Sequence, residues 1–135
     1  MMSTRETSDW MTTIDLTADT FEQAITDNPI VLVDWWAAWC GPCRSFGPTF
    51  EKASEAHPDI VFGKVDTEAE QSLAGSAGIS SSPTLMAFRS GILVFSQPGA
   101  LPAPALEEII GRIRALNMDD IRAQIAQSQA ATAAS

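Results

Sequence analysis

The hydrophobic positions of this chain fall into short continuous runs and into stripes with helical spacing. Two runs, 30–37 and 60–65, are mostly apolar and are typical of strands buried on both faces. Between them, Phe46, Phe50 and Ala53 recur along one side of a helix. Strand, helix and strand at this spacing predict two parallel strands joined by a right-handed crossover.

Weaker patterns extend this unit in both directions. We expect further strands at 13–16, 84–88 and 92–95, and further helices through Phe21 and Ile25, over 68–77 and from Pro102 or Pro104 to Leu116. Ser90-Gly91 is a tight turn, so the last two strands should form an antiparallel hairpin. The sequence therefore predicts one α/β domain, with a central mixed β-sheet and helices on both faces.

The two ends of the chain differ from this domain, which we place at residues 12–117. Residues 1–11 are polar and mixed, and we interpret them as a flexible leader. Residues 118–135 carry an apolar stripe of Met118, Ile121 and Ile125 and end in small and polar residues. They are predicted to form a short C-terminal tail, helical or partly disordered, that packs on the domain, docks on a partner or frays.

The composition fits a soluble globular protein, because 45% of its 135 residues are hydrophobic. The formal net charge of −9 argues against nucleic acid and anionic membranes as partners, since an excess of carboxylates is repelled by both. No apolar run is long enough to cross a bilayer, and the N-terminus lacks the apolar segment of a secretory signal. We expect a cytoplasmic protein that is a monomer.

The only two cysteines, Cys40 and Cys43, lie where the first buried strand ends and the long helix begins. Backbone N–H groups and the helix dipole favour an anion there, so the pKa of a cysteine should be lowered and its reactive thiolate favoured. Gly41 and Pro42 keep the two residues close enough for a disulfide. We expect Cys40 to be accessible and to attack a partner's disulfide. Cys43, one turn inside the helix, should then resolve the mixed disulfide.

Three other interpretations of the cysteines are weaker. A zinc site needs about four ligands, and the chain adds only His57, in another segment, so no metal site is expected. A structural disulfide would close a very small loop, stabilise little and need an oxidising compartment. Two inert core cysteines would not normally flank Gly41-Pro42 at a strand–helix junction.

Asp34 interrupts the first buried run, where an ionised carboxylate is costly. Burial should raise its pKa and make the carboxylate a proton acceptor near neutral pH. The alternative is an aspartate that faces solvent at a frayed strand end.

These features resemble the thioredoxin family over about residues 12 to 117. The motifs that carry the resemblance, in the family's order and spacing, are Val33-Asp34-Trp35-Trp36-Ala37, Trp39-Cys40-Gly41-Pro42-Cys43, Pro48, Lys64-Val65-Asp66, Ser82-Pro83-Thr84 and Pro98-Gly99-Ala100. The resemblance implies the thioredoxin fold and the reduction of disulfides in other proteins. It also implies electrons from NADPH through a thioredoxin reductase. The chain has neither a phosphate loop nor a dinucleotide fingerprint, so no bound cofactor is expected.

The resemblance also implies roles for single residues. Asp34 would take the proton of Cys43 through water, with Lys64 as its charge partner. Pro83 would be a cis proline, and the backbone of Ser82 would bind an extended substrate segment. The family usually has isoleucine or threonine where this chain has Ser82, which puts its substrate range and redox potential in question.

A flat, uncharged contact surface around Cys40 is expected from five residues, Trp39, Gly41, Pro42, Gly99 and Ala100. Two alternative functions remain open for the chain as a whole. One is an oxidase or isomerase of the same fold, which equilibrium with glutathione would reveal. The other is a non-catalytic interaction subunit that docks through the Trp39–Pro42 surface, and it would keep its partner after Cys40→Ser.

Overall fold

The computed structural model describes residues 12–134; the predicted leader, residues 1–11, lies outside them. The elements, in chain order, are β1 (Thr13–Asp15), α2 (Phe21–Asp27), β2 (Ile30–Trp36), α3 (Gly41–Ala56), β3 (Val61–Asp66), α4 (Gln71–Ser76), β4 (Thr84–Arg89), β5 (Ile92–Pro98), α5 (Ala103–Ala115) and α6 (Met118–Ala134). Every strand and helix predicted from the sequence is present, with bounds that differ by a few residues.

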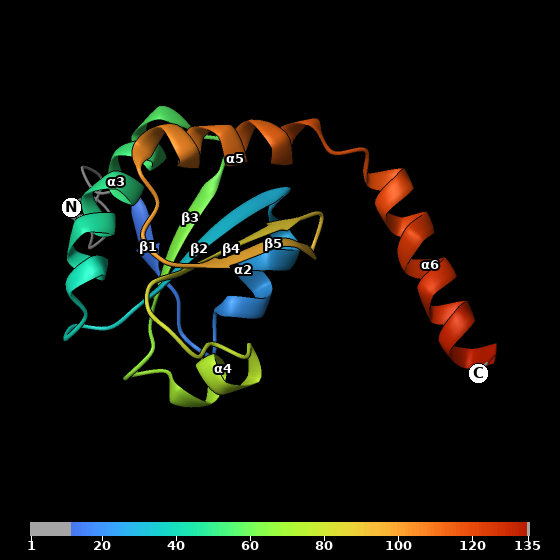
Figure 1. The fold of residues 1–135 in the computed structure, drawn as a ribbon, viewed down its shortest axis with the longest axis horizontal. Helices are drawn as coiled ribbons and strands as arrows, with labels where there is room; N and C mark the ends of the chain where they lie inside the picture. Colours follow the sequence, from blue (N-terminus) through green and yellow to red (C-terminus); the bar gives the residue numbers. More distant parts are fainter. Residues whose placement is uncertain (1–11, 135) are drawn as a thin grey trace, which may run out of the picture.

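The strands form one mixed sheet in the order β1-β3-β2-β4-β5 (Figure 1). β1 and β2 both run parallel to β3, whereas β4 is antiparallel to β2 and to β5. The predicted hairpin turn is present: Ser90 and Gly91 both have positive φ, 54° and 79°. β2 therefore lies in the centre of the sheet, with a neighbour on each side, which explains its almost continuous apolar sequence.

Helices cover both faces of the sheet, and the alternation of side chains along β2 decides which core each residue joins. Leu32 packs with α3 and α5, in a core that includes Phe50 and Leu106. Its neighbour Val33 points to the other face and packs with α2 and α4. Figure 1 shows α3 and α5 together on one side of the sheet and α4 on the other. Even-numbered residues of β2 thus face α3, the helix that begins at the cysteine pair.

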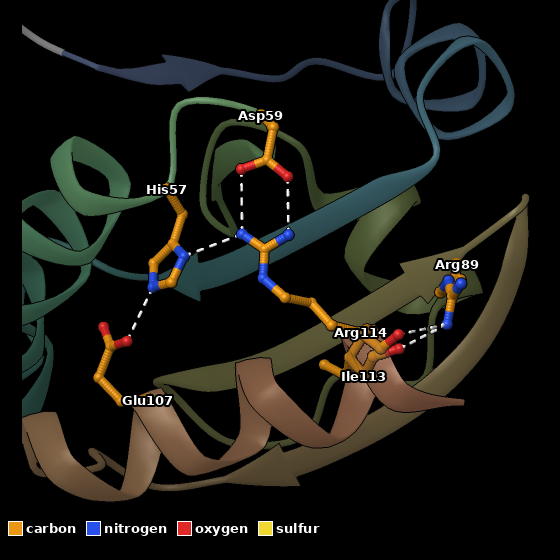
Figure 2. A network of polar contacts seen from close by, with 6 residues as sticks. All are labelled: His57, Asp59, Arg89, Glu107, Ile113 and Arg114. Atoms are coloured by element: carbon orange, nitrogen blue, oxygen red, sulfur yellow. Dashed lines mark hydrogen bonds and ion pairs between the residues drawn. The ribbon is translucent and has the colours of Figure 1, made fainter.

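A network of polar contacts holds α5 to the loop that follows α3 (Figure 2). Arg114 donates two hydrogen bonds to the carboxylate of Asp59, at 2.7 and 3.0 Å, and a third to Nδ1 of His57 at 2.9 Å. The hydrogen bonds from Arg114 to the carboxylate lower the pKa of Asp59 to about 2. The other ring nitrogen of His57 lies 2.7 Å from Oε1 of Glu107. His57 is thus a residue of the α3 terminus, as its place before Pro58 predicts.

The C-terminal end of α5 is capped by a side chain from the sheet. Arg89 in β4 donates hydrogen bonds of 2.8 Å to the carbonyl groups of Ile113 and Leu116 (Figure 2 draws the contact with Ile113). Both carbonyl groups lie at the C-terminal end of the helix, where a cation is favourable because the helix dipole is negative there. The cap lies between the end of α5 at Ala115 and the start of α6 at Met118.

The tail is a helix, α6, which extends away from the sheet in Figure 1. Of the predicted stripe, Met118 is buried, whereas Ile125 is exposed. Only the start of α6 therefore packs on the domain. None of the helices in residues 12–134 is long and apolar enough to span a membrane.

Gly63 in β3 gives a test of how tightly the sheet is packed. A Cβ atom at this position would overlap the buried side chain of Leu16. We expect Gly63→Ala to lower the free energy of unfolding by about 1–3 kcal/mol, the usual cost of overpacking a core. Urea unfolding measures it.

Gly111→Ala is the matched control. A Cβ at Gly111 meets no atom within 4 Å, and alanine favours the helix, so this variant should be neutral or more stable by up to about 1 kcal/mol. Equal destabilisation of the two variants would contradict the packing of Leu16 against β3.

Candidate active site

The two cysteines lie at the N-terminus of α3, directly after the central strand. β2 ends at Trp36, the backbone N–H of Cys40 donates to the carbonyl of Ala37 at 3.1 Å, and Cys40 is the N-cap of the helix. The Cα atoms of Cys40 and Cys43 are 5.3 Å apart, and the residues are joined by a disulfide. Pro42 lies in the first turn, where its missing N–H costs no helical hydrogen bond. The structure is that of an oxidised dithiol pair.

The surroundings of the two sulfur atoms differ. The backbone N–H of Cys43 donates a hydrogen bond to Sγ of Cys40 at 3.2 Å. The same sulfur lies 3.3 Å from the carbonyl oxygen of Ser82, in the loop before β4. An N–H group of the first helical turn thus points at Cys40 Sγ, where it would stabilise a thiolate in the reduced protein.

The expectation that Cys40 is accessible and Cys43 is not is wrong for the disulfide form. Cys40 is only 3% exposed and Cys43 is 7% exposed. Both sulfur atoms are in the disulfide, and the two residues pack in a small cluster with Ala37 and Trp36. The asymmetry of the pair therefore lies in hydrogen bonding and in which side of the pair each residue faces, not in exposed area.

Asp34 is buried beneath α3, as its place in the apolar run predicts. It is 1% exposed, and neither carboxylate oxygen has a hydrogen-bond partner among the described residues. Burial raises its pKa from 3.8 to about 7, although the positive charge of Lys64 acts in the opposite direction. The solvent-facing alternative is thereby excluded, and the carboxyl group can exchange a proton near neutral pH.

Lys64 lies directly opposite Asp34 in the parallel register of β2 and β3. Within residues 12–134, however, no ion pair joins their side chains. The ammonium group instead lies over the ring of Trp36, 5.6 Å from the ring centroid. Lys64 thus influences Asp34 through its field rather than by contact.

A cavity of about 260 Å³ joins the buried carboxyl group to the cysteine pair. Its lining residues come from β2, the following turn, α3 and β3: Asp34, Trp36, Ala37, Ala38, Cys43, Arg44, Gly47 and Lys64. Water fits in a polar space of this size. Asp34, Cys43 and Lys64 were predicted as site residues, whereas Trp36, Arg44 and Gly47 were not. Trp36 could have been found, because it is two residues after Asp34 in a strand and so shares its face.

The loop before β4 brings the remaining predicted residues to the other side of the pair. The Ser82–Pro83 peptide bond is cis, as the resemblance implies. The carbonyl of Pro83 accepts a hydrogen bond from the N–H of Gly99 at 2.7 Å, which places Gly99 and the following Ala100 at this end of the sheet. Gly99 and Ala100 are both exposed, as are Gly41 and Pro42.

Trp39 is the most exposed large hydrophobic side chain described, at 69%. It lines a groove of about 320 Å³ with the loop of Ser80, Ser81 and Ser82 and with residues of α4. Since the carbonyl of Ser82 also lies beside Cys40, the groove adjoins the disulfide. Among the described residues, no group of three or more His, Cys, Asp or Glu side chains is placed to hold a metal ion.

Comparison with known proteins agrees with this geometry. The sequence model of the thioredoxin family, described as "Thioredoxin", matches residues 12–112. This chain belongs to the thioredoxin family. A Streptomyces coelicolor relative named "Putative thioredoxin 2" is 58% identical over 118 residues, which cover 87% of this chain and 88% of the relative.

Two solved thioredoxins have the same fold. The thioredoxin of Malassezia sympodialis is 32% identical, with a TM-score of 0.70 over 78% of this chain and 93% of its own. Mitochondrial thioredoxin 3 of Saccharomyces cerevisiae, in its oxidised form, is 30% identical, with a TM-score of 0.70 over 78% of this chain and 99% of its own. The Cys40–Cys43 pair of this family member identifies it as a thiol–disulfide oxidoreductase with disulfide reductase activity. Thioredoxins act on disulfide substrates and receive electrons from thioredoxin reductases.

The raised pKa of Asp34 predicts how stability depends on pH. The folded protein holds this proton up to about pH 7, and the unfolded chain only to 3.8, so folding stability falls as the pH rises between these values. Asp34→Asn removes that loss. We expect the oxidised variant to be more stable than the wild type by roughly 2–4 kcal/mol at pH 8, with a gain that shrinks towards pH 4.

Urea unfolding of both oxidised proteins from pH 4 to pH 8 measures the effect. Asp27→Asn, in an exposed residue at the end of α2, is the control for a change of net charge. A gain for Asp34→Asn that is the same at every pH would contradict the assignment.

Proposed function

We propose that the protein reduces disulfides of other proteins with Cys40 as the nucleophile and Cys43 as the resolving thiol. The observation that carries this assignment is the hydrogen bond from the N–H of Cys43 to Sγ of Cys40, at the N-terminus of α3. It favours negative charge on Cys40 rather than on Cys43. Cys40 also lies beside the loop of Ser82, on the side of the exposed residues.

The reaction has two exchange steps. The Cys40 thiolate attacks one sulfur of the substrate disulfide; a bond forms between them, and the other substrate sulfur leaves as a thiolate that takes up a proton. Cys43 then loses its proton and attacks Sγ of Cys40. The Cys40–Cys43 disulfide forms, and the first substrate sulfur leaves as the second thiolate. Two electrons pass from the dithiol to the substrate.

Asp34 takes the proton of Cys43 in the second step, through water in the cavity that the two residues share. Its pKa of about 7 supports this role, because a base poised near the working pH can accept the proton and release it again. Lys64 supplies the positive charge that favours the ionised carboxylate.

The substrate segment binds on the opposite side of the pair. The backbone of Ser82, next to cis Pro83, would hydrogen-bond an extended chain, and the position of its carbonyl 3.3 Å from Cys40 Sγ supports this role. Trp39 forms one wall, and the exposed glycine, proline and alanine residues of the two neighbouring segments leave room for a partner. These residues are Gly41, Pro42, Gly99 and Ala100.

We further propose that NADPH supplies the electrons through a thioredoxin reductase, that the protein works in the cytoplasm as a monomer, and that it binds no cofactor. Membership of the thioredoxin family supports the reductase as the donor. A compartment that keeps thiols reduced suits a catalytic cysteine pair, which supports the cytoplasm.

Replacing the resolving thiol tests the roles of the two cysteines. In Cys43→Ser the mixed disulfide between Cys40 and a substrate cannot be resolved, so the reduced variant should capture proteins from a cell extract through bonds that dithiothreitol cleaves. Gel electrophoresis with and without the reductant measures the capture.

Cys40→Ser is the matched control, and it should capture no protein and reduce no insulin. A Cys40→Ser protein that still binds its partner would favour the docking alternative. A potential close to that of glutathione in the wild type would favour the oxidase or isomerase.

Ser82 sets the second test. Ser82→Ile adds an apolar side chain to the residue whose carbonyl lies 3.3 Å from Cys40 Sγ, and apolar surroundings disfavour a thiolate. We expect a more negative redox potential, with the equilibrium constant against glutathione changed roughly threefold to tenfold, or about 15–30 mV. Ser80→Ile adds the same group two residues away and should leave the potential unchanged. Identical potentials and insulin-reduction kinetics in Ser82→Ile and the wild type would show that the serine is neutral.

A further inference from the structure

The cavity between Asp34 and Cys43 has a wall that no step of the proposed reaction uses, the indole of Trp36. Trp36 ends β2 two residues after Asp34, and Lys64 lies opposite Asp34 in β3. All three side chains therefore share the sheet face that α3 covers, and all three line the cavity. The backbone of Trp36 is fixed, since its carbonyl accepts hydrogen bonds from the N–H and the hydroxyl of Thr67 at 2.9 and 3.0 Å.

Lys64 has two groups of β2 within reach, the carboxyl group of Asp34 and the ring of Trp36. Its strand position places it directly across from a carboxyl group that lacks any hydrogen-bond partner among the described residues. Yet its ammonium group lies over the Trp36 ring, 5.6 Å from the centroid, within the range of a cation–π interaction. The ring face and the carboxylate compete for the same cation.

The other charged groups around the cavity are engaged elsewhere. Arg44 of α3 donates to the carbonyl of Ala38 at 3.2 Å. Asp66, opposite Trp36 in the register of β2 and β3, accepts the N–H groups of Glu68 and Ala69. Cys43 is held in the disulfide. Of the described residues that line the cavity, Lys64 is thus the cation that can approach Asp34.

We propose that Trp36 is a positioning residue: its ring holds the ammonium group of Lys64 away from Asp34, so that the carboxyl group stays able to take up and release a proton. Contact with a cation would keep the carboxylate ionised, because an opposite charge at contact distance favours the charged form. A permanently ionised Asp34 could not change protonation state near neutral pH. The proposal deepens the proposed role of Asp34 and rests on it for its functional meaning, but the electrostatic arrangement is testable by itself.

The experiment is a titration of the Asp34 carboxyl carbon by 13C NMR in the oxidised protein, in which the disulfide removes both thiols from the titration. The signal is assigned by its loss in Asp34→Asn. In Trp36→Leu, Lys64 is released to Asp34, and the midpoint should fall by about one to three pH units. Trp36→Phe keeps a ring face and should titrate close to the wild type.

Lys64→Met separates the proposal from a general opening of the cavity. Without the ammonium group the midpoint should rise above that of the wild type, and adding Trp36→Leu should then have no further effect. A fall of the same size in both backgrounds would overturn the proposal, because it would come from water that enters the space left by the indole. An unchanged midpoint in Trp36→Leu would also overturn it.

A measurement on the wild type keeps the test valid if Trp36→Leu does not fold. The ring current of Trp36 should shift the Cε protons of Lys64 upfield, and Trp36→Phe should reduce that shift. Cε protons at the ordinary lysine position would refute the contact. Because these readouts need no turnover, they are independent of the activity. Unchanged insulin reduction by Asp34→Asn would reject the proton role of Asp34 while leaving the arrangement of Trp36 and Lys64 intact.

Discussion

The packing of α3 against the central strand is the constraint on which the site depends. Phe50 packs on Phe62, with ring centroids 5.1 Å apart, in the core that also holds Leu32 of β2. This core holds α3 over the face of the sheet to which the even-numbered residues of β2 point. The same face carries Asp34, and the first turn of the helix carries Cys43. Burial of apolar side chains thus brings a carboxyl group and a thiol to one cavity without any direct bond between them.

The site is built at a cost in stability. A buried carboxyl group without a hydrogen-bond partner opposes folding, and most strongly when it is ionised. Asp34 is tolerated because the strands and helices around it are held by large apolar contacts. The burial that opposes folding also raises the pKa of Asp34 to about 7, which is the value that the proposed proton transfer needs.

The strands, the helices and Asp34 could be predicted from sequence because each has a local signal: period, turn residues, or a charge in an apolar run. The burial of Cys40 could not, since it depends on the disulfide and on Ser82, 42 residues away in sequence. The position of the Lys64 ammonium group over the Trp36 ring could not be predicted either. Strand pairing indicates that Lys64 lies beside Asp34, but it does not indicate where the end of its side chain lies. Both features depend on tertiary contacts between distant segments, which a local sequence pattern does not contain.

The disulfide separates two kinds of chemistry. On one side, Cys43 faces a cavity of titratable groups, Asp34 and Lys64. On the other, Cys40 faces the carbonyl of Ser82, which also lines the groove beside Trp39. In the proposed mechanism, proton transfer and substrate recognition therefore draw on different residues. Under the two proposals, a change at Ser82 would affect substrate binding without disturbing proton transfer from Cys43, and a change at Trp36 would do the reverse. Under the proposed mechanism, the departure at Ser82 therefore bears on the choice of partner and on the potential of the pair, and not on the attack of Cys43 on Cys40.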